Sequence, residues 1–341
     1  MLHTSDFDFE LPTELIASHP LSRRDASRML VVDGNSVSDK HIRDFLDYLR
    51  PGDVVVFNNS KVIPARFMAG DHEITLHTAV NDKDWWGLCK KFNKINIGDT
   101  LTLDDGTTIT VTDKDDESGL LLHFNCDNVF DVLDKVGKMP LPPYMKREEE
   151  VSDRERYQTV YAEPLGSMAA PTAGLHFTPE LMKEIEARGA KIVKVTLHVG
   201  AGTWMPVKTE NLAEHKMHSE WCCITPQQAN TINNATRVIA VGTTSMRTLE
   251  SANMLAKESG SDLRVLPICQ STNIFITPGY KFGAVDVLLT NFHLPKSTLF
   301  MLVSAFSGLD EMKSAYAHAV AEKYRFFSYG DCCLLFKKGA Q

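Results

Sequence analysis

Short segments of alternating apolar and polar residues fill the chain between about residues 66 and 136. Asn, Asp and Gly residues separate these segments, which cover residues 73–80, 85–88, 100–103, 107–112 and 119–124. A period of two places the apolar side chains on one face of a strand, and the separating residues favour turns. The pattern therefore predicts a small antiparallel β-barrel in this part of the chain.

Outside this region, strands are predicted to alternate with helices. An apolar strand at 53–57 precedes the barrel, and Thr178 can cap a helix that has Pro179 at its first position and Gly189 just past its end. Further strands are predicted at 192–199, 238–241, 285–289 and 332–336, and further helices at 246–256, 299–306 and 311–324. Such alternation favours a mostly parallel or mixed sheet that is covered by helices.

The strand at 53–57 needs partners, and the only large sheet is predicted to follow the barrel. The sequence therefore predicts an α/β fold with one discontinuous α/β domain, formed by residues 1–65 and 151–341. The small antiparallel β-barrel domain, residues 66–150, is inserted into it. A chain of 341 residues with 43% hydrophobic residues is long enough to bury the cores of two such domains.

Composition narrows the function classes. The net charge of −8 argues against broad, nonspecific affinity for nucleic acid. No run of eighteen apolar residues occurs, and the first ten residues are acidic rather than basic and apolar, so we expect no membrane span, no signal peptide and a cytoplasmic location. The seven cysteines are odd in number and lack CxxC spacing, so we expect all of them to be reduced thiols.

Two runs, AAPTAGLHF at 169–177 and TNFHLPKST at 290–298, place a histidine among turn-forming and hydroxyl residues. The second of them, like the runs LHVGAGT and VGTTSMR, begins where a predicted strand ends, which is the edge at which open α/β sheets bind ligands. Gly200 and Gly202 would let the backbone approach a ligand there, and Thr243 and Thr244 offer amides and hydroxyls at a helix start. Neither a dinucleotide fingerprint nor a phosphate loop is complete.

Five histidines, His176, His198, His215, His218 and His293, lie in or beside these runs. An imidazole can exchange protons near neutral pH, whereas a single histidine taken alone is more often structural. Five at one sheet edge predict that at least one is functional. The spacing of His215 and His218 also suits a pair of metal ligands, so a metal site is the alternative.

Aromatic residues near the same runs can stack on a nucleobase or simply fill the core; they are Tyr144, Tyr157, Tyr161, Trp204, Trp221 and Phe292. Positive charge is concentrated in the first half of the chain, where it forms either a local basic patch or a solvated mixed face.

Long motifs in order along the chain resemble the S-adenosylmethionine:tRNA ribosyltransferase-isomerase family of queuosine biosynthesis. They include FELPTELIASHP, PGDVVVFNNSKVIPARF, YQTVYAEPLGSMAAPTAGLHFT, VTLHVGAGTWMPV, VIAVGTTSMRTLES and TNFHLPKSTLFMLVSAF. The resemblance implies transfer of the ribosyl part of S-adenosylmethionine to 7-aminomethyl-7-deazaguanine at the wobble position of a tRNA. Epoxyqueuosine forms, and adenine and methionine are released. S-adenosylmethionine is then a consumed substrate, no cofactor or metal is implied, and a monomer is expected.

The resemblance also suggests roles for individual residues. Proton transfer is assigned to His176 or His293, with His198 and His218 as alternates. Substrate contacts are expected from Thr172, Gly174, Gly200, Gly202, Thr243, Thr244, Arg247, Asn291 and Lys296. Contacts with tRNA phosphates are expected from Lys90, Lys91, Lys138, Lys146 and Arg147.

Among the departures from the family pattern, two concern acidic residues. Asn59 and Asn273 stand where the family commonly has acidic residues, so a carboxylate role at either position is doubtful. Two other function classes remain open: a metal-dependent hydrolase, which would carry stoichiometric metal, and a noncatalytic RNA-binding protein, which would use the barrel and the basic residues alone.

Overall fold

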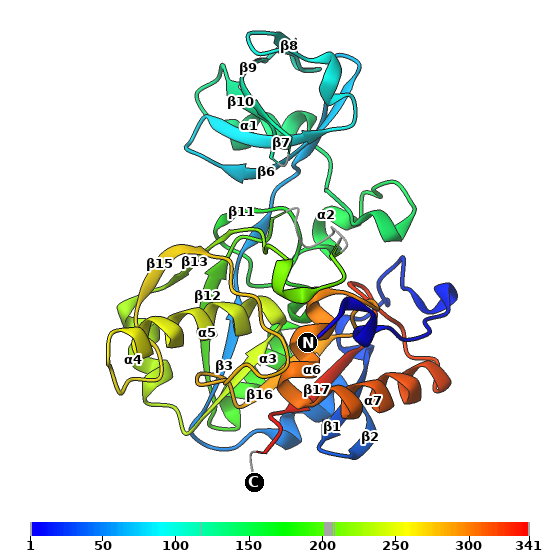
Figure 1. Cartoon of the computed structure of the whole chain (residues 1–341), viewed down its shortest axis with the longest axis vertical. Helices are drawn as coiled ribbons and strands as arrows, with labels where there is room; N and C mark the ends of the chain where they lie inside the picture. The colour runs from blue at the N-terminus through cyan, green and yellow to red at the C-terminus, as the bar shows by residue number, and fades with distance from the viewer. Residues whose placement is uncertain (1, 117, 201–206, 208, 340–341) are drawn as a thin grey trace.

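A nine-stranded mixed sheet forms the centre of the larger part of the molecule (Figure 1). The computed structural model describes residues 2–116, 118–200, 207 and 209–339. The strand order is β15-β13-β12-β3-β14-β16-β17-β1-β2. The strands are β1 (Arg28–Asp33), β2 (Ser36–His41), β3 (Asp53–Asn58), β12 (Lys191–Leu197), β13 (Glu220–Ile224), β14 (Arg237–Val241), β15 (Ile268–Thr272), β16 (Val287–Asn291) and β17 (Cys332–Phe336).

Strand direction changes across this sheet. The strands β12, β3, β14 and β16 run parallel to one another, as do β17 and β1, whereas β13, β15 and β2 pair antiparallel with their neighbours and β16 pairs antiparallel with β17. All six residues of β3 are buried, as a central parallel strand requires. The predicted α/β fold with a mixed sheet is thus confirmed.

Helices cover both faces of the sheet. Along β3, Val54 and Val56 pack into the core formed with α5, α6 and α7, whereas Val55 and Phe57 pack into the core formed with α3. The helices are α3 (Pro179–Ala187), α4 (Pro226–Asn233), α5 (Thr243–Glu258), α6 (Thr298–Ser307) and α7 (Leu309–Ala321). Thr178 caps α3 through its side chain, as predicted. Across the described ranges, no helix combines the length and the apolar character needed to cross a membrane.

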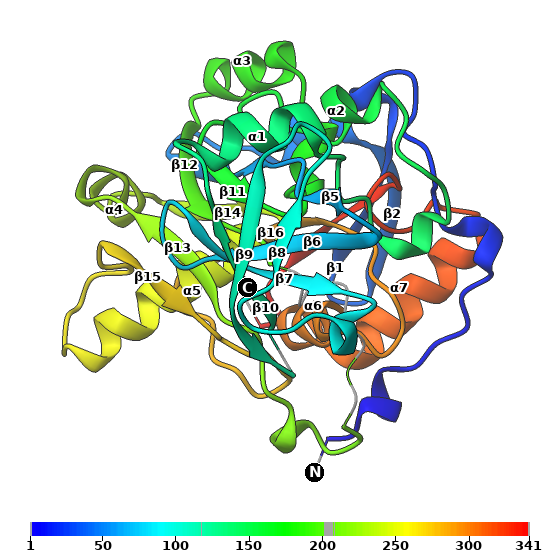
Figure 2. The same ribbon diagram turned by 90° about the horizontal axis from the view of Figure 1, so that it is seen from above.

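The barrel is a six-stranded antiparallel sheet in the order β5-β6-β7-β10-β9-β8, and it lies beyond one end of the nine-stranded sheet (Figures 1 and 2). A bridge between Ala69 and Leu103 nearly closes it, because it joins the end of the first strand in the order to the residue after the last. Helix α1 (Val129–Val136) packs Val132 and Leu133 into its core. Its strands are β5 (Arg66–Ala69), β6 (His72–Ala79), β7 (Asp84–Cys89), β8 (Thr100–Thr102), β9 (Thr108–Asp115) and β10 (Gly119–Phe124).

Short elements complete the fold. The parallel pair β4 (Lys61–Val62) and β11 (Leu165–Ser167) lies near the places where the chain enters and leaves the barrel, and α2 (Asp153–Arg156) follows the barrel in the chain. The 3₁₀ helices are Thr4–Phe7, Thr13–Leu15, Arg24–Ala26, Ile42–Tyr48, Phe92–Lys94, Pro143–Met145, Thr172–His176 and Leu212–Glu214. The inserted barrel is confirmed, and the domain limits at 65 and 150 stay predictions.

The expectation that all seven cysteines are reduced is wrong. Cys223 on β13 and Cys269 on β15 form a disulfide. The two residues face each other in the register of adjacent antiparallel strands, with their Cα atoms 4.0 Å apart. Spacing in the sequence does not reveal this pairing, because neither strand was predicted. The other five cysteines are free.

Candidate functional site

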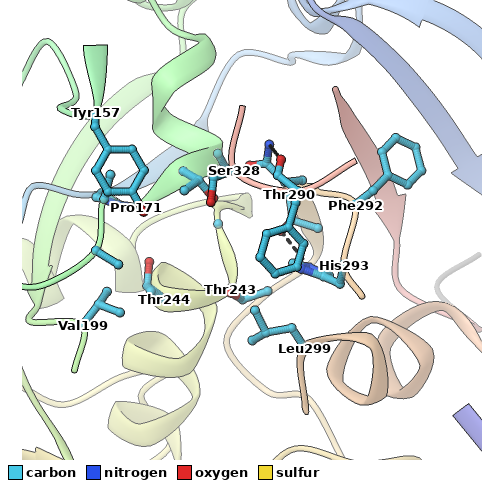
Figure 3. Close-up of a pocket in the computed structure, with 17 residues that line it drawn as sticks. Tyr157, Pro171, Val199, Thr243, Thr244, Thr290, Phe292, His293, Leu299 and Ser328 are labelled. Carbon is cyan, nitrogen blue, oxygen red and sulfur yellow. Dashed lines mark hydrogen bonds between the residues drawn. The ribbon is translucent and has the colours of Figure 1, made fainter. Parts of the chain in front are cut away.

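A pocket opens where β12, β14 and β16 end, and we call it the strand-end pocket (Figure 3). About 580 Å³ of its space is not filled by atoms, and this figure includes open solvent. It lies at the sheet edge at which the sequence predicted a site. Its lining includes Tyr157, Thr172, Val199, Thr243, Thr244, Thr290, Asn291, His293 and Ser328.

The start of α5 forms one wall of the strand-end pocket. Gly242 precedes the helix with a φ of 87°, a conformation that favours glycine, and it brings Thr243 and Thr244 into the lining. The first amides of a helix have no partner within the helix, and they attract negative charge. The Thr244 hydroxyl is buried and has no hydrogen-bond partner. This wall is therefore suited to a polar or anionic part of a ligand.

His293 presents a neutral imidazole in the lining of the strand-end pocket. Its Nε2 lies 3.2 Å from the Thr290 hydroxyl, and its backbone amide donates to the hydroxyl of Tyr316 over 3.0 Å. Burial lowers the pKa of the imidazole from its ordinary value of 6.5 to about 3, because the charged form would lose its hydration. The ring can therefore accept a proton at neutral pH, although with reduced basicity.

Asn291 is held in one orientation beside His293. Its Nδ2 donates to the carbonyl oxygens of Phe327 over 3.0 Å and of Asp331 over 3.3 Å. Two carbonyl acceptors fix which end of the amide carries the nitrogen. The opposite atom, Oδ1, is buried without a hydrogen-bond partner. Asn291 itself lines the strand-end pocket.

His176 lies outside the strand-end pocket but contacts it through Asn291. Its Nε2 is 3.2 Å from Asn291 Nδ2, and its Nδ1 is 2.9 Å from the hydroxyl of Ser27. Burial, with smaller contributions from the charges of Arg24 and Arg325, lowers the pKa of His176 to about 4. The ring lines a separate small depression that also includes Arg24 and Ser27.

A second, larger cavity lies between the barrel and the nine-stranded sheet, and we call it the barrel cleft. It has about 1550 Å³ of atom-free space, part of it solvent. His198 and Gly200 line this cleft rather than the strand-end pocket. His218 is exposed and near enough to His77, which lines the cleft, for their interaction to add to the lowering of the His77 pKa by burial. The predicted group of histidines is thus divided, because His293 lines the strand-end pocket, His198 lines the barrel cleft and His176 lines a separate depression.

Two predicted substrate contacts are engaged in ion pairs outside the strand-end pocket. Arg247 pairs with Glu220 where both side chains are buried, and the same carboxylate accepts from the Gly200 amide over 2.9 Å. Lys296 is exposed and pairs with Asp8 over 2.8 Å. Both cations are therefore already partnered.

Besides Gly200, two further glycines were predicted to contact the substrate, Gly174 and Gly202. Gly174 packs against Tyr161, where an added Cβ would come within 2.0 Å of the Tyr161 hydroxyl, so close packing explains this glycine. Gly202, like Trp204, falls outside the described residues.

The predicted tRNA contacts are mostly accessible. Lys90, Lys138 and Lys146 are exposed, and Lys91 is exposed with its Nζ 3.3 Å from the carbonyl of Asp71. Arg147 differs, because its guanidinium makes two hydrogen bonds to Asp153, of 2.6 and 2.8 Å, and its side chain is only 13% exposed. Arg147 thus has a structural partner and does not present a free guanidinium to a phosphate.

The alternative prediction was a metal site. Among the residues that the structure describes, no three His, Cys, Asp or Glu side chains are grouped so that they could hold a metal ion. His215 instead makes an edge contact with Phe275, with ring centroids 5.1 Å apart. Asn59, at one of the positions of family departure, accepts from the Thr196 hydroxyl over 2.8 Å and donates to Glu163 over 3.3 Å. Asn59 lines neither the strand-end pocket nor the barrel cleft.

Sequence reasoning did not single out Phe327 and Ser328, which also line the strand-end pocket. Phe327 adopts a φ of 75°, which is uncommon for a residue other than glycine and often marks a functional segment. The only signal in the sequence was their place in the run YRFFSYGD, where Phe326 and Tyr329 are their immediate neighbours. The turn that brings them to β16 becomes evident only from the fold.

Known proteins resemble the chain over almost its full length. The family described as queuosine biosynthesis protein matches residues 4–335. An S-adenosylmethionine:tRNA ribosyltransferase-isomerase from Rickettsia bellii (strain OSU 85-389) is 49% identical, with 98% of this chain and 99% of that protein covered. A protein of the same name from Parvibaculum lavamentivorans is 48% identical at the same coverage. The crystal structure of S-adenosylmethionine tRNA ribosyltransferase from Thermotoga maritima has a TM-score of 0.53 and 32% identity, and covers 96% of this chain and 99% of its own.

Proposed function

The chain belongs to the queuosine biosynthesis family of S-adenosylmethionine:tRNA ribosyltransferase-isomerases, and we propose that its strand-end pocket binds S-adenosylmethionine and carries out the reaction. The ribosyl group moves to the aminomethyl group of 7-aminomethyl-7-deazaguanine at the tRNA wobble position. It rearranges to the epoxycyclopentanediol of epoxyqueuosine, while adenine and methionine leave. The observation that carries the assignment is that two residues line the same pocket: His293, whose imidazole is neutral, and Asn291, whose Oδ1 has no hydrogen-bond partner.

Proton removal is assigned to His293. The positive sulfur of S-adenosylmethionine acidifies the ribose carbon next to it, so a base that reaches this carbon can start the reaction. Of the four predicted histidines, His293 is the one that lines the strand-end pocket. Its low pKa keeps it unprotonated at neutral pH, and the cationic substrate does not have to enter beside an imidazolium.

The rest of the pocket binds and orients the substrate. The methionine carboxylate fits the first amides of α5, beside Thr243 and Thr244. A ribose hydroxyl can donate to Asn291 Oδ1, which has no other partner. The rings of Tyr157 and Phe327 supply apolar surface for the adenine. His176 positions Asn291 and does not itself meet the substrate.

The partners follow from the same reaction. The tRNA backbone is assigned to the exposed lysines, Lys90, Lys91, Lys138 and Lys146. S-adenosylmethionine is consumed as a substrate, and no cofactor is needed by this reaction. We also propose a cytoplasmic enzyme, because its substrates are tRNA and a small metabolite, and we expect it to be a monomer.

The direct test is to incubate the protein with S-adenosylmethionine and tRNA that carries the deazaguanine precursor, and to measure free adenine. His293→Ala is expected to lower turnover by roughly 10²- to 10⁴-fold, as is usual for loss of a general base. His318→Ala, which changes a half-buried histidine on α7 that lines neither cavity, is the matched control and should keep wild-type turnover. Wild-type turnover in His293→Ala would refute the assignment.

The tRNA surface needs a separate test. Reversing the charge of Lys90 and Lys91 should weaken tRNA binding and reduce its dependence on salt, because fewer counterions are released. The matched control is Lys183→Glu on α3, which lies outside the basic region. Unchanged affinity and salt dependence in the double variant would remove these lysines from the interface.

A further inference from the structure

The barrel cleft is lined from two sides that come from different parts of the fold. The barrel supplies the β6–β7 turn, with Asn81 and Asp82, and the start of α1, with Asn128. The nine-stranded sheet supplies His198, at the end of β12, and Trp221, on β13. The chemistry assigned to the strand-end pocket uses none of these residues.

A stack of rings forms the sheet side of the cleft. The rings of His198 and Trp221 are nearly parallel, with a centroid separation of 5.3 Å and an interplanar angle of 19°. The backbone of Gly166 also lies against the imidazole, so that a Cβ there would be 3.0–3.1 Å from three ring atoms. Ser60 holds the ring edge through a 2.7 Å hydrogen bond to Nδ1. His198 is thus a fixed support for Trp221.

Trp221 is 41% exposed although His198 covers one face of its ring. Among the described residues it has no second ring partner. A large, rigid aromatic face that opens into a cavity is the arrangement on which unpaired nucleobases stack. The exposed ring is therefore a binding surface rather than a core residue.

The charges in the cleft favour a base over a phosphate. Asp82 and Asp127 are exposed there, and Glu220 contributes a third carboxylate, which is paired with Arg247. Carboxylates repel the RNA backbone but accept hydrogen bonds from the N–H groups on the edge of a guanine-like base. The phosphates must then be held outside the cleft.

The cleft and the strand-end pocket share a wall. His198 and Gly200 face the cleft, whereas Val199 between them lines the pocket. The Val199 amide donates to the Ser167 hydroxyl over 2.9 Å, and this hydroxyl donates to the carbonyl of Ala169 over 2.8 Å. A base in the cleft and a ligand in the pocket would therefore both contact the segment at 198–200.

From these observations we propose that the barrel cleft receives the unpaired wobble base of the tRNA, stacked on Trp221, with His198 as the positioning residue behind it. This inference rests on the proposed function, because it assumes that the second reactant is a tRNA base. In this proposal the strand-end pocket holds S-adenosylmethionine and the barrel cleft holds the tRNA base, on the two sides of the shared wall.

The test compares Trp221→Ala, Trp221→Phe and the matched control Trp86→Ala, a half-buried tryptophan on β7 that does not line the cleft. Two tRNAs are used, one with the deazaguanine precursor and one that is abasic at the wobble position but otherwise identical. We measure the affinity for each tRNA, and we measure S-adenosylmethionine affinity by calorimetry.

Loss of one stacked base is expected to weaken binding of the precursor tRNA roughly 5- to 150-fold in Trp221→Ala. The abasic tRNA should bind wild type and Trp221→Ala equally, and Trp221→Phe should recover most of the affinity. The affinity for S-adenosylmethionine should stay unchanged in every variant. An equal loss for both tRNAs, or wild-type affinity of Trp221→Ala for the precursor tRNA, would overturn the proposal. Failure of the proposed function would differ, because the wild-type protein itself would then release no adenine.

Discussion

The side-chain amide of Asn291 donates a hydrogen bond to Nε2 of His176 over 3.2 Å. An imidazole that accepts at Nε2 carries its proton on Nδ1, and this atom lies 2.9 Å from the Ser27 hydroxyl. The low pKa of His176 keeps the ring in this neutral form. His176 therefore influences the strand-end pocket by holding the side-chain amide of Asn291, a residue that lines this pocket.

This relationship predicts how His176 variants behave. His176→Ala is expected to weaken S-adenosylmethionine binding by about tenfold, equivalent to about 1.4 kcal/mol, because the Asn291 amide loses one restraint. His176→Gln should recover part of the affinity, since its carbonyl can accept the same hydrogen bond. Calorimetry and steady-state kinetics separate binding from turnover. Unchanged affinity with a large fall in kcat would instead identify His176 as a proton-transfer group.

The buried histidines predict a loss of stability in mild acid. The folded pKa is about 3 for His293 and about 4 for His176 and His198, whereas the ordinary value is 6.5. Below pH 6.5 the unfolded chain therefore binds protons that the folded chain does not. The free energy of unfolding should fall as the pH decreases from 6.5 towards 4, by up to about 1.4 kcal/mol per pH unit for each histidine.

Urea unfolding at a series of pH values measures this slope. His293→Gln should reduce the slope below pH 6.5 by the contribution of one histidine. Above pH 7.5 both states are neutral at this position, so the slopes of the variant and of wild type should agree there, which is the internal control. Identical slopes below pH 6.5 would show that His293 titrates normally.

The ion pair between Arg247 and Glu220 is predicted to matter for stability. Glu220→Ala leaves the Arg247 charge buried without its carboxylate, which is expected to cost about 3–5 kcal/mol. Replacing both residues with Met should recover much of this loss. The exposed pair of Asp8 and Lys296 is the matched control, where Asp8→Ala should cost about 1 kcal/mol or less. Equal losses for Glu220→Ala and Asp8→Ala in urea unfolding would contradict the assignment.

Gly166 gives a test of the ring stack that leaves both rings in place. Its φ is 142°, and the Cβ of an alanine would press against the His198 ring. Gly166→Ala is expected to destabilise the protein by about 1 kcal/mol or more and to raise the KM for tRNA. The KM for S-adenosylmethionine should not change. A rise in both KM values would mean that the stack also shapes the strand-end pocket.

The sequence was sufficient wherever a local pattern determines the structure. Thr178 caps its helix as predicted, and the alternating segments form the barrel. It was insufficient where distant strands meet, because register is set by packing over the whole sheet. The pairing of Cys223 with Cys269 is one such case.

The candidate site shows the same limit. Both His198 and His293 follow strands, and the sequence placed them at one edge of the sheet. The sequence did not reveal that the barrel forms a second cavity, which His198 lines whereas His293 lines the strand-end pocket. The partners of Arg247 and Arg147 were likewise invisible, since Glu220 and Asp153 carry no pattern that marks them as ion-pair partners.

The position of β3 has a consequence for synthesis of the protein. This strand is wholly buried between β12 and β14, yet its neighbours begin at Lys191 and Arg237, beyond the inserted barrel. Because the chain is synthesised from its amino end, the apolar strand β3 remains without its partner strands until more than a hundred later residues have been translated. Nascent chains stalled in that interval are the ones that chaperones would need to shield from aggregation.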